Sequence, residues 1–222
     1  MLALAAIAIV VYAAFFRPAT QGQSTLRLPN FGQALQTAGK CPASVYPPGA
    51  QYAFERCVSG RSPVGWPRCA TVTSSVNAAG APAGNRPDVQ HAMATLAAAT
   101  GLHLVPAAHA ADIRISWDPS LYNPVPGSSG EAGETDFRTA TGWSGVRVES
   151  ATVRISSHLA TGASPGIGEV PVLLHELGHA VGLAHEGGAV VMNPVDRGFT
   201  HYQPGDLAGL AVLYHPAACT AG

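Results

Sequence analysis

Two histidines in one short stretch have the spacing that metal binding requires. His175 and His179 lie four residues apart in a run with helical periodicity, so both imidazoles project from one face about a turn apart. Two imidazoles in this arrangement can bind one zinc ion at about 2.0–2.1 Å. Glu176 directly follows the first histidine, at the edge of the same face. Its carboxylate can therefore reach a zinc-activated water without ligating the metal, which predicts a general base.

A third ligand can come from the residues that follow this helix. A straight helix would carry residue 185 past the metal, but Gly182 permits the left-handed backbone that ends a helix sharply. The chain can then turn back and bring His185 to the ion. Three protein ligands leave a fourth position open for water, which is typical of catalytic rather than structural zinc sites.

The elements that must position these residues are indicated by periodicity. Pro171 suits a first helical turn, and the helix that follows has an apolar side. That side consists of Leu173, Leu174, Leu177, Ala180 and Val181. From Gly65 onward, the pattern predicts an α/β (α+β) domain with a twisted mixed sheet. We expect strands over 70–76, 102–105, 111–117 and 146–155, a helix over 87–100 and a long loop over 123–141. The last strand has a break in its alternation at Glu149–Ser150.

The histidine stretch resembles the metzincin zinc-protease motif H-E-x-x-H-x-x-G-x-x-H, which a Met-turn follows. Every fixed position from His175 to His185 is filled, and Met192 supplies the methionine. A lone H-E-x-x-H occurs by chance in helices, whereas the glycine, third histidine and methionine add matches in the right order. The chain is most similar to matrixins, because the histidine-to-methionine distance is short and residues 204–214 resemble the matrixin C-terminal helix.

The resemblance implies a metzincin-like fold and further roles. Met192 would form an apolar floor beneath the imidazoles, and Asp206 would support the Met-turn besides capping the last helix. Pro194 stands where some metzincins carry a tyrosine ligand, so no such ligand is expected. In metzincins the strand before the zinc helix, here 146–155, lies along the cleft and can accept substrate as one more strand. Residues 194–197 would shape the pocket on the leaving-group side.

The start of the chain indicates export. Residues 2–16 form an uninterrupted apolar run, shorter than the roughly 20 residues of a comfortable membrane span. A positive start and a clear cleavage site are missing, so residues 1–17 are either a signal peptide or a signal anchor. The protein would then be secreted, or anchored to the outer face of the membrane. Residues 18–60 are expected to form a Pro/Gly-rich linker or small disulfide-bonded extension, or a propeptide, before a matrixin-like catalytic domain over 61–222.

Four cysteines fit an exported protein with two disulfides. Of the three connectivities, we favour Cys41–Cys57, which closes a short loop, and Cys69–Cys219, which ties the start of the catalytic domain to its end. A second interpretation of Cys69 exists. Pro67-Arg68-Cys69 matches the first three residues of the matrixin cysteine switch, in which a propeptide thiolate occupies the open zinc position. The rest of the switch motif is absent, since Ala70 follows instead of glycine.

The composition of the chain limits the classes of binding partner that we expect. The 222-residue chain has a net charge of −1 and no basic run, which argues against nucleic acid. We expect a monomer that meets a membrane only through its N-terminal segment. Acidic residues between 118 and 145 can bind calcium, although a solvated loop explains them equally well. These are Asp118, Glu131, Glu134 and Asp136. The other histidines, at positions 91, 103, 109, 158, 201 and 215, are not at ligand spacing and are expected to be surface or hydrogen-bonded residues.

These features predict an exported zinc metalloendopeptidase that hydrolyses protein or peptide substrates. One catalytic Zn²⁺ would be held by His175, His179 and His185, with Glu176 as general base. The alternative is an exported zinc-binding, non-hydrolytic module for a peptide or wall component. Glu176 argues against that alternative, because binding alone needs no base. A redox protein is disfavoured, since no thiolate cluster or cofactor motif is present.

Overall fold

The fold is that of a computed structural model, which describes residues 38–122, 130–142, 145–161, 168–215 and 219. All of these residues belong to one compact unit, residues 31–222. The apolar run 2–16 lies outside the described residues, so the choice between signal peptide and signal anchor stays a prediction. Among the described helices, none combines the length and apolarity that a membrane span requires.

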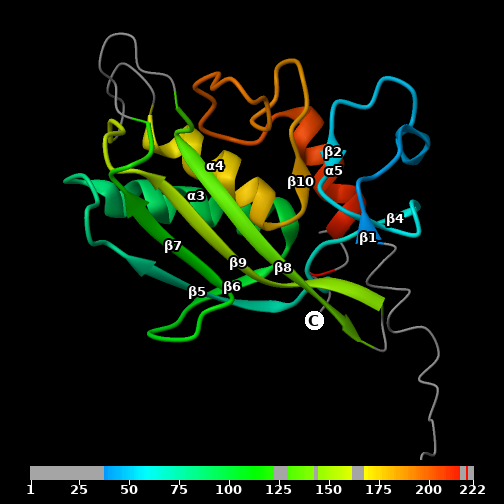
Figure 1. The fold of residues 1–222 in the computed structure, drawn as a ribbon, viewed down its shortest axis with the longest axis horizontal. Helices are drawn as coiled ribbons and strands as arrows, with labels where there is room; N and C mark the ends of the chain where they lie inside the picture. The colour runs from blue at the N-terminus through cyan, green and yellow to red at the C-terminus, as the bar shows by residue number, and fades with distance from the viewer. Residues whose placement is uncertain (1–37, 123–129, 143–144, 162–167, 216–218, 220–222) are drawn as a thin grey trace, which may run out of the picture. The chain divides into compact units, whose positions relative to one another are not determined.

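Five strands form the main sheet, in the order β6-β5-β7-β9-β8 (Figure 1). They are β5 (Thr71–Asn77), β6 (His103–Pro106), β7 (Ile113–Asp118), β8 (Gly133–Gly142) and β9 (Gly145–Ser156). All neighbours are parallel except β8, which runs antiparallel to β9. The predicted α/β class with a mixed sheet is therefore confirmed. In β7 the alternating apolar residues of the sequence, Ile113, Ile115 and Trp117, all point into the core, as the alternation predicted.

The predicted loop over 123–141 is wrong in its second half, because β8 begins at Gly133. Residues 123–129 lie outside the described part of the chain. β8 is an edge strand, and most of its side chains are half-buried rather than alternately buried and exposed. The sequence of β8 therefore does not alternate between apolar and polar residues. That alternation is the signal from which a strand is predicted.

β9 contains the irregularity that its sequence indicates. Arg138 of β8 pairs with Ser150, whereas the next residue, Thr139, pairs with Val148. Glu149 is thus an extra residue in β9, a β-bulge. The bulge explains the break in alternation, since Val148 and Ser150 would otherwise lie on the same face of the strand.

The helices α3 and α4 lie on the same side of the sheet (Figure 1). The three described helices are α3 (Asn85–Thr100), α4 (Glu169–Ala180) and α5 (Pro204–Tyr214). α3 ends at Gly101, which adopts a left-handed conformation as expected. Leu173, Leu174 and Leu177 of α4 are fully buried, and burial of each contributes about 1.5–3 kcal/mol. This apolar side fixes the rotation of α4 and so determines where its histidines project.

Residues 38–64 form short elements, of which three strands pair with one another and one strand pairs with a strand that follows α4. They are β1 (Ala38–Gly39), η1 (Ala43–Val45), β2 (Ala53–Phe54), β3 (Cys57–Val58) and β4 (Ser62–Pro63). β2 pairs with β10 (Leu183–Ala184), which follows α4. The Arg56 guanidinium lies 5.8 Å from the ring centroid of Phe137 in β8. The predicted boundary at residue 60 stays a prediction, but this segment packs against the region that contains the histidines.

Both predicted disulfides, Cys41–Cys57 and Cys69–Cys219, are present. The four cysteines are all used, so none is free. Cys69 therefore has no thiolate to offer in the cysteine-switch interpretation. Two disulfides indicate that the protein matures in an oxidising environment.

Candidate metal centre

Hydrogen bonds from the Nδ1 atoms fix the orientation of the two histidine rings of α4. His175 Nδ1 donates to the carbonyl oxygen of Val191 at 2.8 Å, and His179 Nδ1 donates to that of Leu183 at 2.9 Å. A carbonyl oxygen only accepts, so Nδ1 carries the proton in each neutral ring. The Nε2 atom of each imidazole therefore has its lone pair directed toward the other histidines and available for a metal.

The backbone after α4 reverses at Gly182 and returns His185 to the same place. Gly182 has a φ of +104°, a region that favours glycine. A Cβ at this position would also overlap the carbonyl oxygen of Val64. β10 then runs back along β2 and ends at Ala184, immediately before His185. The predicted sharp helix end at Gly182 is confirmed.

Two buried aromatic residues secure the C-terminal end of α4. Trp66 Nε1 donates to the carbonyl oxygen of Ala180 at 2.9 Å, and the Tyr214 hydroxyl donates to that of Val181 at 2.6 Å. The same hydroxyl accepts the Trp66 backbone N–H at 3.1 Å. Carbonyls at a helix end lack partners within the helix, so these bonds stabilise the turn from which the third histidine is reached.

The three imidazoles fit one metal ion. His175 Nε2 lies 3.1 Å from His179 Nε2 and 3.0 Å from His185 Nε2. Tetrahedral ligands at about 2.0–2.1 Å from zinc stand roughly 3.3–3.4 Å apart, so these two separations need to grow only slightly to admit the ion. A donor set of three imidazole nitrogens suits zinc as well as copper, iron or nickel. Within the described ranges, this is the group of three that can hold a metal.

Met192 lies in a turn whose backbone N–H groups are held by Asp206. The Asp206 carboxylate accepts the backbone N–H groups of Val191 at 2.8 Å and Met192 at 3.2 Å. It also accepts the Gln203 N–H at 2.8 Å and so caps α5. Both roles expected for Asp206 are therefore seen. Gly178 of α4 permits the close approach of the turn, since a Cβ there would overlap Met192 Sδ. The turn in this way supplies the carbonyl that orients the first histidine.

Glu176 is held against β8 by a specific contact. Its side chain is buried, and Thr135 Oγ1 donates to its Oε2 at 2.7 Å. Gly133 provides the space, because a Cβ there would lie 2.5 Å from Glu176 Cγ and 2.6 Å from its Oε1. Burial raises the pKa of Glu176 above the ordinary glutamate value, although His179 and the Thr135 hydrogen bond oppose this in part. The result is a fixed carboxyl group with raised proton affinity beside the histidines.

A cleft of about 470 Å³ contains the three histidines and Glu176. β8 lines it with Gly133, Glu134 and Thr135. The strand along the cleft is therefore β8, and the assignment of this position to 146–155 is wrong. Those residues form β9, which lies one place further inside the sheet, between β7 and β8. β8 has β9 as its neighbour on one side, so its other edge is free of a strand within the described residues.

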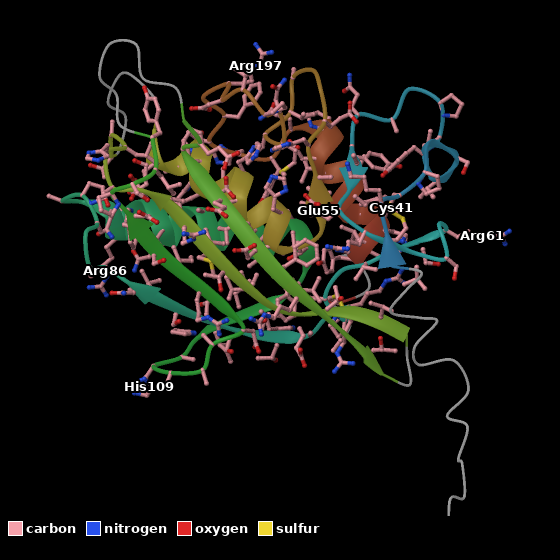
Figure 2. All side chains as sticks on the ribbon, in the orientation of Figure 1. Cys41, Glu55, Arg61, Arg86, His109 and Arg197 are labelled. Carbon is pink, nitrogen blue, oxygen red and sulfur yellow. A yellow bond between two sulfur atoms is a disulfide. The ribbon has the colours of Figure 1, made fainter. Side chains whose placement is uncertain are left out.

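The segment that follows Met192 also borders the cleft. Pro194 and Asp196 line it, as the resemblance implied, whereas the Arg197 side chain extends away from the ribbon (Figure 2). Asp196 Oδ1 accepts the backbone N–H of Gly198 at 2.7 Å, which fixes the local turn.

The three histidines differ in their ionisation in the absence of a metal. Burial and the neighbouring His179 lower the pKa of His175 to about 4. The same two causes lower the pKa of His185. Burial also acts to lower the pKa of His179, but the hydrogen bond to Glu55 and the charge of Glu176 outweigh it and raise this pKa. Neutral imidazoles bind metals, so two of the three ligands need no deprotonation at neutral pH.

The acidic residues considered for calcium are used differently. Asp118 and Glu134 both pair with Arg154, at 3.3 Å and 2.6 Å, and Glu131 lines the cleft. In the described part of the chain, no acidic group of three converges as a metal site would. The possible calcium ion therefore gains no support, and the other six histidines join no metal-binding group there either.

Three contributors to the site are absent from the predictions made from sequence: Gly133, Thr135 and Glu55. Gly133 and Thr135 fell within the predicted loop. Once 133–142 is known to be a strand, their spacing of two places them on the same face. Glu55 gave no signal, because a single acidic residue in an irregular segment is usually a solvated one.

Comparisons with families and curated proteins identify no relative of this chain. A scan against models of protein families finds no match for this chain, and a search of curated proteins finds none either. Function therefore has to be inferred from the site itself.

Proposed function

We propose that this chain is an exported zinc-dependent metalloendopeptidase of the matrixin-like metzincin type. The observation that supports this most is the combination of three imidazoles and one buried carboxylate in a single cleft. His175, His179 and His185 direct nitrogen atoms at a common point, and Glu176 lines the same cleft without belonging to the cluster. A purely metal-binding module would not need the contacts that hold this carboxylate.

In this proposal the metal ligands, Glu176 and Thr135 have separate roles in the hydrolysis of a peptide bond. His175, His179 and His185 would hold a zinc ion, which would supply a Lewis acid for the scissile carbonyl and lower the pKa of water toward about 7. Glu176 takes a proton from the attacking water and passes it to the nitrogen of the leaving amine. Thr135 keeps one oxygen of that carboxylate occupied at 2.7 Å, which leaves the other to carry the proton.

The shape of the cleft suits an extended peptide. β8 borders it with residues 133–135, and the outer edge of β8 is free of a strand among the described elements. A substrate can therefore add to this edge through main-chain hydrogen bonds, as β-strand addition does. Residues Pro194 and Asp196 then contact the substrate on the leaving-group side.

The location and state of the protein are part of the proposal. Two disulfides support maturation outside a reducing cytoplasm. Residues 1–17 would direct the chain there as a signal peptide or a signal anchor. We expect a monomer, secreted or held at the outer face of the membrane.

The experiment that tests this function compares the wild-type protein with Glu176→Gln on a broad peptide library. Glutamine keeps the shape of the side chain but cannot accept a proton, so bound zinc should remain near one equivalent. Loss of general-base assistance lowers rates by about 10²–10⁴-fold, and the loss should appear mainly in kcat. Glu169→Gln is the matched control, because Glu169 lies on the same helix, fully buried and outside the cleft.

Two outcomes would contradict the proposal in different ways. If zinc-loaded wild-type protein cleaves no peptide, the non-hydrolytic binding module becomes the better interpretation. If wild-type and Glu176→Gln proteins cleave equally well, another base acts and the role of Glu176 is wrong.

A further inference from the structure

The carboxylate of Glu55 contacts His179, one of the proposed metal ligands, at the ring nitrogen that faces away from the metal position. Glu55 Oε1 lies 2.9 Å from His179 Nδ1, the nitrogen that faces away from the metal position. The Glu55 side chain is 32% exposed and that of His179 only 12%, so the contact is partly shielded from solvent. In Figure 2, Glu55 lies close to β10 and α4, whereas Arg61 of the same segment extends outward.

The backbone around Glu55 is held on both sides. The Glu55 N–H donates to the carbonyl oxygen of Gly182 at 3.0 Å, which extends the pairing of β2 with β10. The next residue, Arg56, accepts the Val64 N–H at 2.9 Å. Glu55 is therefore anchored to the same turn that returns the chain toward the third histidine, and its position next to His179 is set by main-chain bonds.

His179 differs in this respect from the other histidine of α4. The Nδ1 atom of His175 has a backbone carbonyl as its partner. The Nδ1 atom of His179 has the carbonyl of Leu183 and the carboxylate of Glu55, both at 2.9 Å. A carboxylate on the far nitrogen of an imidazole fixes the ring orientation and the tautomer, and it makes the near nitrogen a stronger metal donor. Charged acceptors also form the stronger hydrogen bonds.

We propose that Glu55 is a positioning residue for His179, and that residues 38–64 are consequently a lasting part of the metal centre. This rests on the proposed metal site at the three histidines. Glu55 does not touch the ion. It holds one ligand in the binding orientation and tunes its donor strength. A chain that loses this segment keeps the three ligands but loses the carboxylate that supports one of them.

The test measures metal affinity, which does not depend on any cleavage activity. Zinc dissociation constants of the full chain are determined by competition with a chromophoric chelator. Loss of an outer partner of a metal ligand weakens metal affinity by about 10–100-fold. We expect a loss of this size in Glu55→Ala and a smaller loss in Glu55→Gln, which retains one acceptor oxygen. Circular dichroism and intact disulfides establish that both variants are folded.

Glu131→Gln is the matched control. Glu131 also lines the cleft, and its substitution removes the same charge, but it makes no contact with His179 Nδ1 among the described hydrogen bonds and ion pairs. We expect its zinc affinity to change by less than about threefold, well below the effect of an outer-shell partner. Visible absorption of the cobalt-substituted proteins gives a second readout. The bands should shift in the Glu55 variants and stay in place in Glu131→Gln.

The outcomes separate this inference from the proposed function. Equal affinity of the Glu55 and Glu131 variants, or unchanged cobalt spectra in the Glu55 variants, would overturn the role of Glu55. A wild-type protein that binds zinc without cleaving peptides would remove the protease and leave the role of Glu55 intact. A wild-type protein that binds no zinc would overturn both.

Discussion

Two glutamates on α4 are both buried, yet they meet different surroundings. Glu169 is fully buried at the first position of the helix, where its Oε1 accepts the Trp117 indole N–H at 2.7 Å. Glu176, two turns later, lines the cleft and accepts the Thr135 hydroxyl. Burial raises the pKa of both carboxyl groups. A raised pKa alone therefore does not indicate chemistry. The opening to a cleft beside three histidines distinguishes Glu176 from Glu169.

Among changes that leave both glutamates in place, the largest expected effect comes from displacing the Glu176 side chain. Gly133→Ala places a methyl group 2.5 Å from Glu176 Cγ, so the carboxylate must move. Since general-base assistance depends on hydrogen-bond reach, we expect kcat to fall by about 10–100-fold with zinc retained. Gly39→Ala is the control, because an added methyl there meets nothing within 4 Å. Equal kcat values for the two variants would show that the position of Glu176 does not matter.

Glu169 should control pH-dependent stability instead of activity. Burial raises its pKa to about 7, with Asp88 adding to the effect and Trp117 opposing it. Between the ordinary glutamate pKa of about 4.5 and 7, the unfolded chain releases this proton while the folded chain keeps it. Stability from this group is therefore full below that range and declines as pH rises toward 7.

Glu169→Gln removes this titration. The free energy of unfolding, measured in denaturant from pH 5 to pH 8 at a fixed zinc concentration, should decline less in the variant. A difference of about 1–2 kcal/mol between the ends of the range is the expected order. Parallel curves for wild type and variant would show that Glu169 does not bind its proton more tightly in the folded state.

The smallest expected effect concerns the hydrogen bond that orients Glu176. Thr135→Val removes the hydroxyl at nearly constant volume. A single hydrogen bond contributes about 0.5–1.5 kcal/mol, which corresponds to a fall of roughly 2–10-fold in kcat. Thr139→Val, on the same strand but outside the residues that line the cleft, is the control. An unchanged kcat in Thr135→Val would limit the role of this hydroxyl to packing.

Much of the fold and of the metal cluster could be predicted because local patterns determine them. The spacing of His175 and His179 requires only a helix, and the reversal at Gly182 requires only the freedom of glycine to adopt positive φ. The disulfide pairing could also be proposed from position along the chain. In each case the information lies within a short stretch or at the ends of one domain.

The supporting contacts could not be predicted, because they depend on long-range packing. Glu55 meets His179 across 124 positions only after β2 pairs with β10. β8 was missed because an edge strand with half-buried side chains shows no alternation. Gly178 did carry a hint, since glycine inside a helix costs about 1 kcal/mol and so points to a close contact, here with Met192.

The central claim is that three histidines hold one zinc ion, and its most direct test is the zinc content of wild-type and His185→Ala proteins. Removal of a ligand should weaken zinc affinity beyond the about 10–100-fold expected for an outer partner, so dialysed His185→Ala should retain little metal. His109→Ala is the control, because His109 extends away from the ribbon (Figure 2). The account predicts close to one zinc in the wild type and in His109→Ala. Full zinc occupancy in His185→Ala, or none in the wild type, would contradict it.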